Sequence, residues 1–121
     1  MIRDVVDLEV YQLSLTLLKE LYSFLAQVSP SEYDTVKNCK RAAKSIPTNI
    51  AEGFAKRSSK ATFKNHLKIC IGSSDEVVSH LRIVVITIPR LTKGANILIG
   101  KYIVLSKRLN ALHKIWHSDE L

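Results

Sequence analysis

Apolar residues recur along this chain at steps of three and four, the spacing that places them on one face of an amphipathic helix. The pattern stops at prolines and serines and then resumes, which divides the chain into four segments. It predicts helices at residues 5–28, 32–56, 60–88 and 95–117. Four such helices with short connections predict an all-α fold, an antiparallel up-down-up-down four-helix bundle that forms a single domain over residues 1–121.

The residues between the segments define the expected helix ends. Pro30 and Pro89 follow the first and third helices, and proline does not continue a helix comfortably. Ser31 is placed to cap the second helix and Ser59 the third. Residues 92–96 are expected to form a loop and cap before the fourth helix.

The first helix carries two apolar rows rather than one. The rows consist of Leu8, Tyr11, Leu15, Leu18, Tyr22 and Leu25, and of Val6, Val10, Leu13, Leu17, Leu21 and Phe24. The third helix likewise has a main stripe from Phe63 to Ile88 and a weaker second stripe, which consists of Ile69, Gly72, Ile83 and Ile86. Two rows on one helix predict that it is covered on more than one side, by the other helices or by another subunit.

The second helix is centred on residues 45–54 (SIPTNIAEGF), which interrupt a helical pattern with a proline. The apolar positions before and after Pro47 stay in phase, so we expect a kink there rather than a break. In the third helix, the small side chains around Gly72 are expected to let a neighbouring helix approach closely. The fourth helix has one clear stripe, consisting of Leu98, Tyr102, Leu105, Leu109, Leu112 and Trp116.

The chain has a net charge of +7, and the excess lies in one segment. Residues 37–68 hold nine Lys or Arg and one acid, whereas the rest of the chain holds nine bases and ten acids. A basic patch of this kind favours polyanions because binding releases counterions. The alternative interpretation is a solvated surface that keeps an oligomer in solution.

Eight of these bases are candidates for contacting nucleic-acid phosphates: Lys40, Arg41, Lys44, Lys56, Arg57, Lys60, Lys64 and Lys68. Lys60, Lys64 and Lys68 follow one another at four-residue steps and form a row about 12 Å long. The connection to the second helix is short, so this row is expected near the bases of that helix. No feature indicates that individual bases are recognised, because Phe54 and Phe63 lie on core stripes.

Composition places the protein among folded globular proteins, with 46% hydrophobic and 24% charged residues. Cys39 and Cys70 both fall on apolar faces and are expected to be buried free thiols in a reducing compartment. The first seven residues lack the apolar core of a signal peptide, and no apolar run is long enough to span a bilayer. A cytoplasmic protein with no membrane contact is the expectation.

No metal, cofactor or catalytic site is expected. The pairs His113–His117 and His66–Cys70 each supply only two ligands, and Glu-x-x-His, the di-iron motif, is absent. No serine or cysteine lies in a nucleophile motif, and no glycine-rich loop is present to hold a phosphate. Three polar residues lie beside apolar faces, namely Asn49, Glu52 and Glu76. They are interpreted either as a polar network at a subunit contact or a site for a bound group, or as residues with a structural role. In the structural role, Asn49 would donate to carbonyls that Pro47 leaves without a helical donor.

Three stretches carry a family resemblance: residues 8–11 (LEVY), residues 41–54 (RAAKSIPTNIAEGF) and residues 72–76 (GSSDE). They resemble the four-helix-bundle proteins encoded in intervening sequences of bacterial large-subunit ribosomal RNA genes. The shared motif residues are Pro47, Asn49, Glu52, Gly53, Gly72 and Glu76. The resemblance implies a basic homopentamer, and kinship with the accessory variability determinant of diversity-generating retroelements, a partner of a reverse transcriptase and its template RNA.

The sequence therefore predicts a non-enzymatic, homo-oligomeric helical bundle. Its expected function is electrostatic binding of RNA or single-stranded DNA, as an adaptor beside a nucleic-acid enzyme such as a reverse transcriptase. The number five comes from the resemblance alone. The alternative is a structural or protein-interaction oligomer with no nucleic-acid role.

Overall fold

Four long helices account for most of the chain in the computed structural model, which describes residues 2–116. They are α1 (Glu9–Leu25), α2 (Tyr33–Ala55), α3 (Lys60–Thr87) and α4 (Thr92–Ile115). Short 3-10 turns stand before three of them, namely η1 (Val5–Asp7), η2 (Pro30–Glu32) and η3 (Pro89–Leu91). No strand occurs within residues 2–116, so the predicted all-α fold is confirmed.

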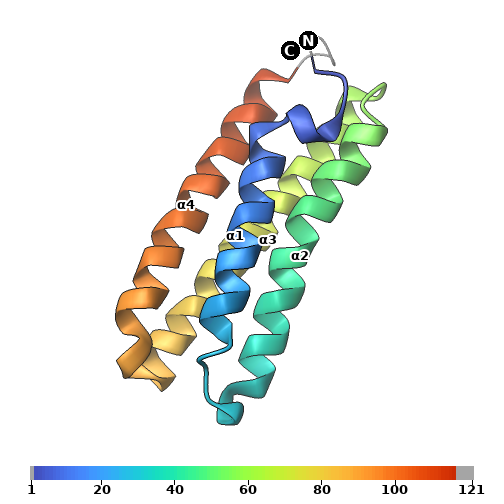
Figure 1. Ribbon diagram of the computed structural model, residues 1–121. Helices are drawn as coiled ribbons and strands as arrows, with labels where there is room; N and C mark the ends of the chain where they lie inside the picture. Colours follow the sequence, from blue (N-terminus) through green and yellow to red (C-terminus); the bar gives the residue numbers. More distant parts are fainter. Residues whose placement is uncertain (1, 117–121) are drawn as a thin grey trace.

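Successive helices run antiparallel, and Figure 1 shows them as one bundle. α1 packs beside α2 and α4, and α3 also packs beside α2 and α4, which leaves α1 and α3 on a diagonal. This is the predicted up-down-up-down arrangement. Helix packing of this kind gives each helix two neighbours and leaves one face outside.

The core contains the predicted stripes of α2, α3 and α4 with few exceptions, Val36 and Leu112 being only half-buried. The two rows of α1 divide: Val10, Leu17 and Leu21 of the second row are buried, whereas Leu15 of the first row is 43% exposed. The second stripe of α3 faces away from the core, with Ile86 78% exposed. The expected cover on this side therefore does not come from the bundle itself.

Three expected helix ends are wrong. The first helix is shorter than predicted, because Asp4 caps a separate turn at residues 5–7 and α1 begins only at Glu9. The fourth helix begins at Thr92, so residues 92–94 are helical rather than a loop; the turn η3 runs directly into it. Ser31 does not cap α2: Ser29 accepts a hydrogen bond from the Ser31 amide at 3.4 Å and caps η2 instead.

Other local predictions agree with the structure. Ser59 caps α3 by accepting a hydrogen bond from the Thr62 amide at 3.2 Å. α2 continues through Pro47 without a break, and the Thr48 hydroxyl donates to the Lys44 carbonyl one turn back at 3.0 Å. The carbonyl that loses its helical donor at Pro47 is that of Ala43, so the Thr48 hydroxyl adds a bond at the neighbouring carbonyl and does not replace the missing one.

The close helix approach lies at Gly53 rather than at Gly72. A Cβ atom at Gly53 would stand 2.5 Å from the Cβ atom of His66, so α2 and α3 meet here at a distance that only glycine permits. A Cβ atom at Gly72 would meet no atom within 4 Å, because this part of α3 faces outward. The expected close neighbour of Gly72 is therefore not a helix of the same chain.

Candidate nucleic-acid interface

The predicted bases of α2 are largely engaged with other side chains. The Lys40 ammonium lies 4.7 Å from the centre of the Tyr22 ring of α1. The Arg41 guanidinium pairs with the Glu76 carboxylate of α3 at 2.7 Å. Lys44 is exposed and forms no ion pair with an acid of the described chain. An engaged base offers less charge to a phosphate, so Lys44 is the α2 base best placed for one.

The two bases at the end of α2 are also engaged. Lys56 pairs with Glu52 one turn earlier at 3.3 Å, with both side chains exposed. The Arg57 guanidinium lies 4.0 Å from the centre of the Phe54 ring and donates to the Phe54 carbonyl at 3.0 Å. Arg57 thus covers the end of the core, where it stabilises packing as well as carrying charge.

The row Lys60, Lys64 and Lys68 lies on the side of α3 that faces α4, not the side that faces α2. Asp75 is seven residues, two helical turns, from Lys68 and so lies on the same side of α3; its carboxylate accepts a hydrogen bond from Ser106 of α4 at 2.8 Å. The α2 neighbour Arg41 instead reaches Glu76 on the other side of α3. The structure therefore separates the two rows that the short connection was expected to bring together.

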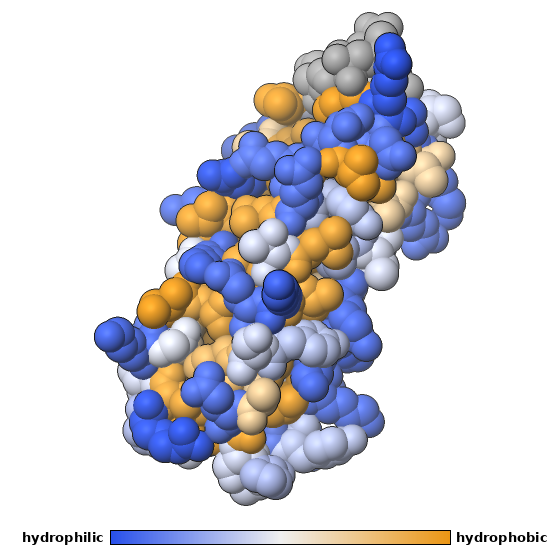
Figure 2. All heavy atoms as spheres, viewed as in Figure 1, coloured by the Kyte–Doolittle hydropathy of each residue, from blue (hydrophilic) through white to orange (hydrophobic). Residues whose placement is uncertain are grey.

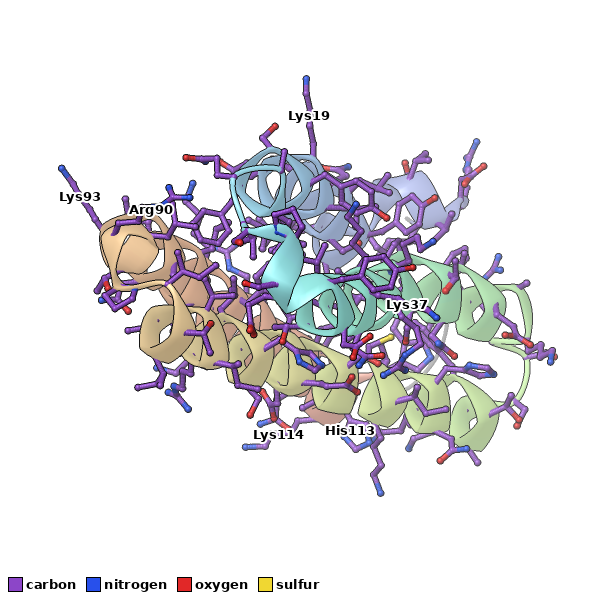
Figure 3. All side chains as sticks on the ribbon, turned by 90° about the horizontal axis from the view of Figure 1, so that it is seen from below. Lys19, Lys37, Arg90, Lys93, His113 and Lys114 are labelled. Atoms are coloured by element: carbon purple, nitrogen blue, oxygen red, sulfur yellow. The ribbon has the colours of Figure 1, made fainter. Side chains whose placement is uncertain are left out.

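This placement brings the α3 row to the end of α4. Partial burial, together with the positive charges of Lys64 and Lys68, lowers the pKa of His113 below its ordinary value. Figure 3 shows His113 and Lys114 at one edge of the bundle and Lys19 of α1 at the opposite edge. Neither residue of α4 was among the predicted phosphate contacts. The overlooked signal is that α4 holds five Lys or Arg and no acid.

The polar motif residues make their contacts within the chain. Asn49 donates to the Ser45 carbonyl at 2.9 Å, and its amide oxygen lies 3.1 Å from Nδ1 of His66. The carbonyl that Asn49 meets is therefore that of Ser45, and not that of Ala43, whose helical donor Pro47 removes. Glu76 holds both Arg41 and His80, the latter at 3.1 Å. These contacts tie α2 to α3 along their shared seam.

The two cysteines are buried and free. Burial raises the pKa of each thiol to about 12, with the Glu76 carboxylate contributing to the rise at Cys39. A thiol of this pKa holds almost no thiolate at neutral pH, so neither is a reactive nucleophile. Among the described residues no three His, Cys, Asp or Glu side chains are grouped to hold a metal ion. His117 of the pair considered for metal lies outside the described residues.

A groove with apolar walls follows the seam between α1 and α4. It comprises three hollows of about 570, 410 and 560 Å³ in sequence along the bundle. Its α4 wall exposes Ile97, Val104 and Ile115, and Figure 2 shows apolar surface along this seam. Two ion pairs cross it, Lys101–Glu20 at 2.8 Å and Arg108–Glu9. Every helix within the described residues is too short or too polar to cross a lipid bilayer.

Comparison with known proteins identifies a family. Residues 6–111 match the family described as "23S rRNA-intervening sequence protein", a span that includes α1, α2, α3 and most of α4. No curated protein matches the chain. Because the match spans most of the sequence, this chain belongs to the 23S rRNA-intervening sequence protein family.

Proposed function

We propose that this protein is a non-enzymatic, homo-oligomeric bundle that binds RNA or single-stranded DNA through backbone phosphates, as an adaptor beside a nucleic-acid enzyme such as a reverse transcriptase. The observation that carries the proposal is the row Lys60, Lys64 and Lys68. None of the three forms an ion pair with an acid of the described chain. Three unpaired ammonium groups in line are suited to phosphates and read no base edges.

The dimensions of the row support this function. Four residue steps at 1.5 Å each place neighbouring lysines of the row about 6 Å apart, so their ammonium groups can contact separate phosphates along one strand. The predicted contacts Arg41 and Lys56 already have carboxylate partners. We therefore assign them a smaller share of the binding than the α3 row. The family description names an intervening sequence of 23S rRNA and assigns no ligand to this chain.

A salt series tests the nucleic-acid function. Fluorescence anisotropy of a labelled RNA hairpin and of single-stranded DNA is followed from 50 to 300 mM salt. Loss of three phosphate contacts in Lys60/Lys64/Lys68→Ala should reduce the slope of log affinity against log salt by about 2, at about 0.7 per contact for a single strand. The control Lys19/Arg90/Lys93→Ala removes the same charge elsewhere (Figure 3). Equal slopes for both variants, or no binding by the wild type, would contradict the proposal.

The homo-oligomeric part of the proposal rests on two separate apolar surfaces. One is the α1–α4 groove, and the other is the outward face of α3 with Ile69, Ile83 and Ile86 exposed. α3 lies diagonally opposite α1, so the two surfaces point in different directions. A contact between unlike surfaces of successive copies is heterologous, and such contacts form a ring where the rotation between copies closes on itself. A second copy is therefore the occupant we propose for the groove, in a ring that the family resemblance suggests has five members.

Sedimentation analysis tests self-association. We expect Ile97→Lys to dissociate the oligomer, because it places a charge on the exposed apolar wall of the groove. Ile97 is 53% exposed, so the change should leave the helical fold intact by circular dichroism. The control is Asn96→Lys, which adds the same charge at the neighbouring exposed position outside the groove lining. A monomeric wild type, or an Ile97→Lys variant as large as the wild type, would rule out the groove as the contact.

If the wild type assembles but shows no salt-dependent binding, the alternative function stands. The protein is then a structural or protein-interaction oligomer. The apolar groove is the observation that favours this alternative, since none of the three lysines of the α3 row lines it.

A further inference from the structure

The phosphate-binding surface is larger than the row on α3. We propose that it continues across the α3–α4 seam, where His113 and Lys114 join Lys64 and Lys68 to bind the phosphodiester backbone of RNA, and that protonation of His113 makes this binding pH-dependent. The inference rests on the proposed function and names the part of the surface that carries it.

The register of the two helices places these residues together. The Ser106 hydroxyl of α4 donates to Asp75 of α3 at 2.8 Å and also contacts the Ser74 hydroxyl at 2.8 Å, which fixes a level in the bundle. The helices are antiparallel, so a step of seven residues toward the start of α3 and a step of seven residues toward the end of α4 run in the same direction along the bundle. Seven residues are about two helical turns, so each step also stays on the same side of its helix. Those steps lead from Asp75 to Lys68 and from Ser106 to His113, about 10 Å away.

Charge along this seam has one sign. α4 contains no acid, and α3 contains none between Lys60 and Ser74. The first acid beyond them, Asp75, already accepts a hydrogen bond from Ser106. Within residues 2–116, the basic surface therefore contains no acid from one end of the α3 row to Lys114. A polyanion that lies along the seam meets bases from two helices, which raises the number of counterions released.

Among the described residues of this surface, His113 is the one whose charge changes near neutral pH. Lys64 and Lys68 face it from α3, and Lys114 is its neighbour on α4. On the other side of α4, Glu9 of α1 forms an ion pair with Arg108. At the same end of the bundle, the Asp7 carboxylate accepts hydrogen bonds from the backbone amides of Arg3 and Asp4. Among the described residues, no carboxylate forms an ion pair with His113.

A bound phosphate changes the equilibrium between the neutral and the protonated form of His113. Its oxygens accept a hydrogen bond from the protonated imidazole and offset the repulsion of the two lysines, so the bound state favours the charged form. Binding then takes up a proton, and linkage requires that affinity rise as the pH falls. At neutral pH His113 is mostly neutral, and lowering the pH adds its positive charge to the surface, more readily when a phosphate is bound.

Anisotropy titrations of the full chain with an RNA hairpin, at pH 7.5 and 5.5 and constant ionic strength, test this inference. We expect wild-type affinity to rise about fivefold at pH 5.5, the effect of about one added phosphate contact near 0.15 M salt, and His113→Gln to remove most of that rise. Lys114→Ala should weaken binding about fivefold at both pH values, whereas Lys93→Ala, at a distant edge of the bundle (Figure 3), should change it little.

The outcomes separate this inference from the proposed function. If the wild type binds RNA and the α3 triple variant weakens it, but His113→Gln keeps the full pH response and Lys114→Ala matches Lys93→Ala, the α4 extension is wrong and the function stands. If the wild type binds RNA at neither pH, both fail. Binding of polyglutamate as tight as that of RNA, with the same dependence on His113, would replace RNA with an acidic protein as the ligand.

Discussion

Trp116→Ala is expected to lower the free energy of unfolding by about 3–5 kcal/mol, the usual cost of truncating a buried aromatic residue. Trp116 is fully buried just after the end of α4. Its ring lies edge-on to Phe63, with centres 4.6 Å apart, and 6.5 Å from Phe54. These three residues form an aromatic cluster that joins α2, α3 and α4 at one end of the bundle. Removing the indole leaves a cavity that the two remaining rings cannot fill without moving.

Denaturant unfolding measures this loss. Trp116→Phe should retain a large share of the stability because it keeps a ring in the cluster. The control, Asn110→Ala, changes an exposed residue on the same helix and should stay within about 0.5 kcal/mol of the wild type. A loss below about 1 kcal/mol in Trp116→Ala would show that the cluster contributes little to stability, and that the core is anchored nearer the middle of the bundle.

Gly53→Ala and Gly72→Ala are expected to change stability in opposite directions, although both replace a helical glycine by the best helix former. At Gly53 the added Cβ stands 2.5 Å from the His66 Cβ atom and 3.0 Å from the Phe63 ring, so α3 has to shift. Overpacking of this kind costs about 1–3 kcal/mol, more than the gain of up to about 1 kcal/mol in helix propensity. At Gly72 the Cβ meets nothing, so only the gain remains.

Both glycine variants are best compared in the Ile97→Lys background and at equal concentration, since self-association adds to measured stability. The expected result is that Gly53→Ala unfolds at lower urea concentration than its parent and Gly72→Ala at higher. The two changes share the same chemistry, so their difference isolates the contact with α3. Equal shifts of the urea midpoint in the two variants would mean that α2 and α3 can move apart at Gly53 without loss of stability.

Helical periodicity was sufficient to predict the architecture because each helix in a bundle buries one face along its whole length. The stripes of α2, α3 and α4 were therefore visible in the sequence, and α2 kept its phase across Pro47. α1 was harder, because two rows of similar hydrophobicity compete and only the contacts with α2 and α4 decide between them. Leu15 and Leu21 look alike in the sequence, yet the first is 43% exposed and the second is fully buried.

The two glycines also show that the sequence does not reveal which positions face a neighbouring helix. Both Gly53 and Gly72 lie within predicted helices, and the sequence offered only the small neighbours of Gly72 as a sign of close packing. Whether a helix approaches a glycine depends on which way that position points in the assembled bundle. His66 supplies the neighbour at Gly53, and no residue supplies one at Gly72.

By itself, the sequence determined the all-α fold, the antiparallel order and the presence of excess positive charge, because these follow from local spacing, short connections and composition. Only the tertiary structure decided which charges lie together. Connected helices need not present their bases on the same side: the lysine row of α3 faces α4, while Arg41 of α2 is paired with Glu76. Neighbours across a seam are set by the rotation of each helix about its axis, and that rotation is chosen by core packing of the whole bundle.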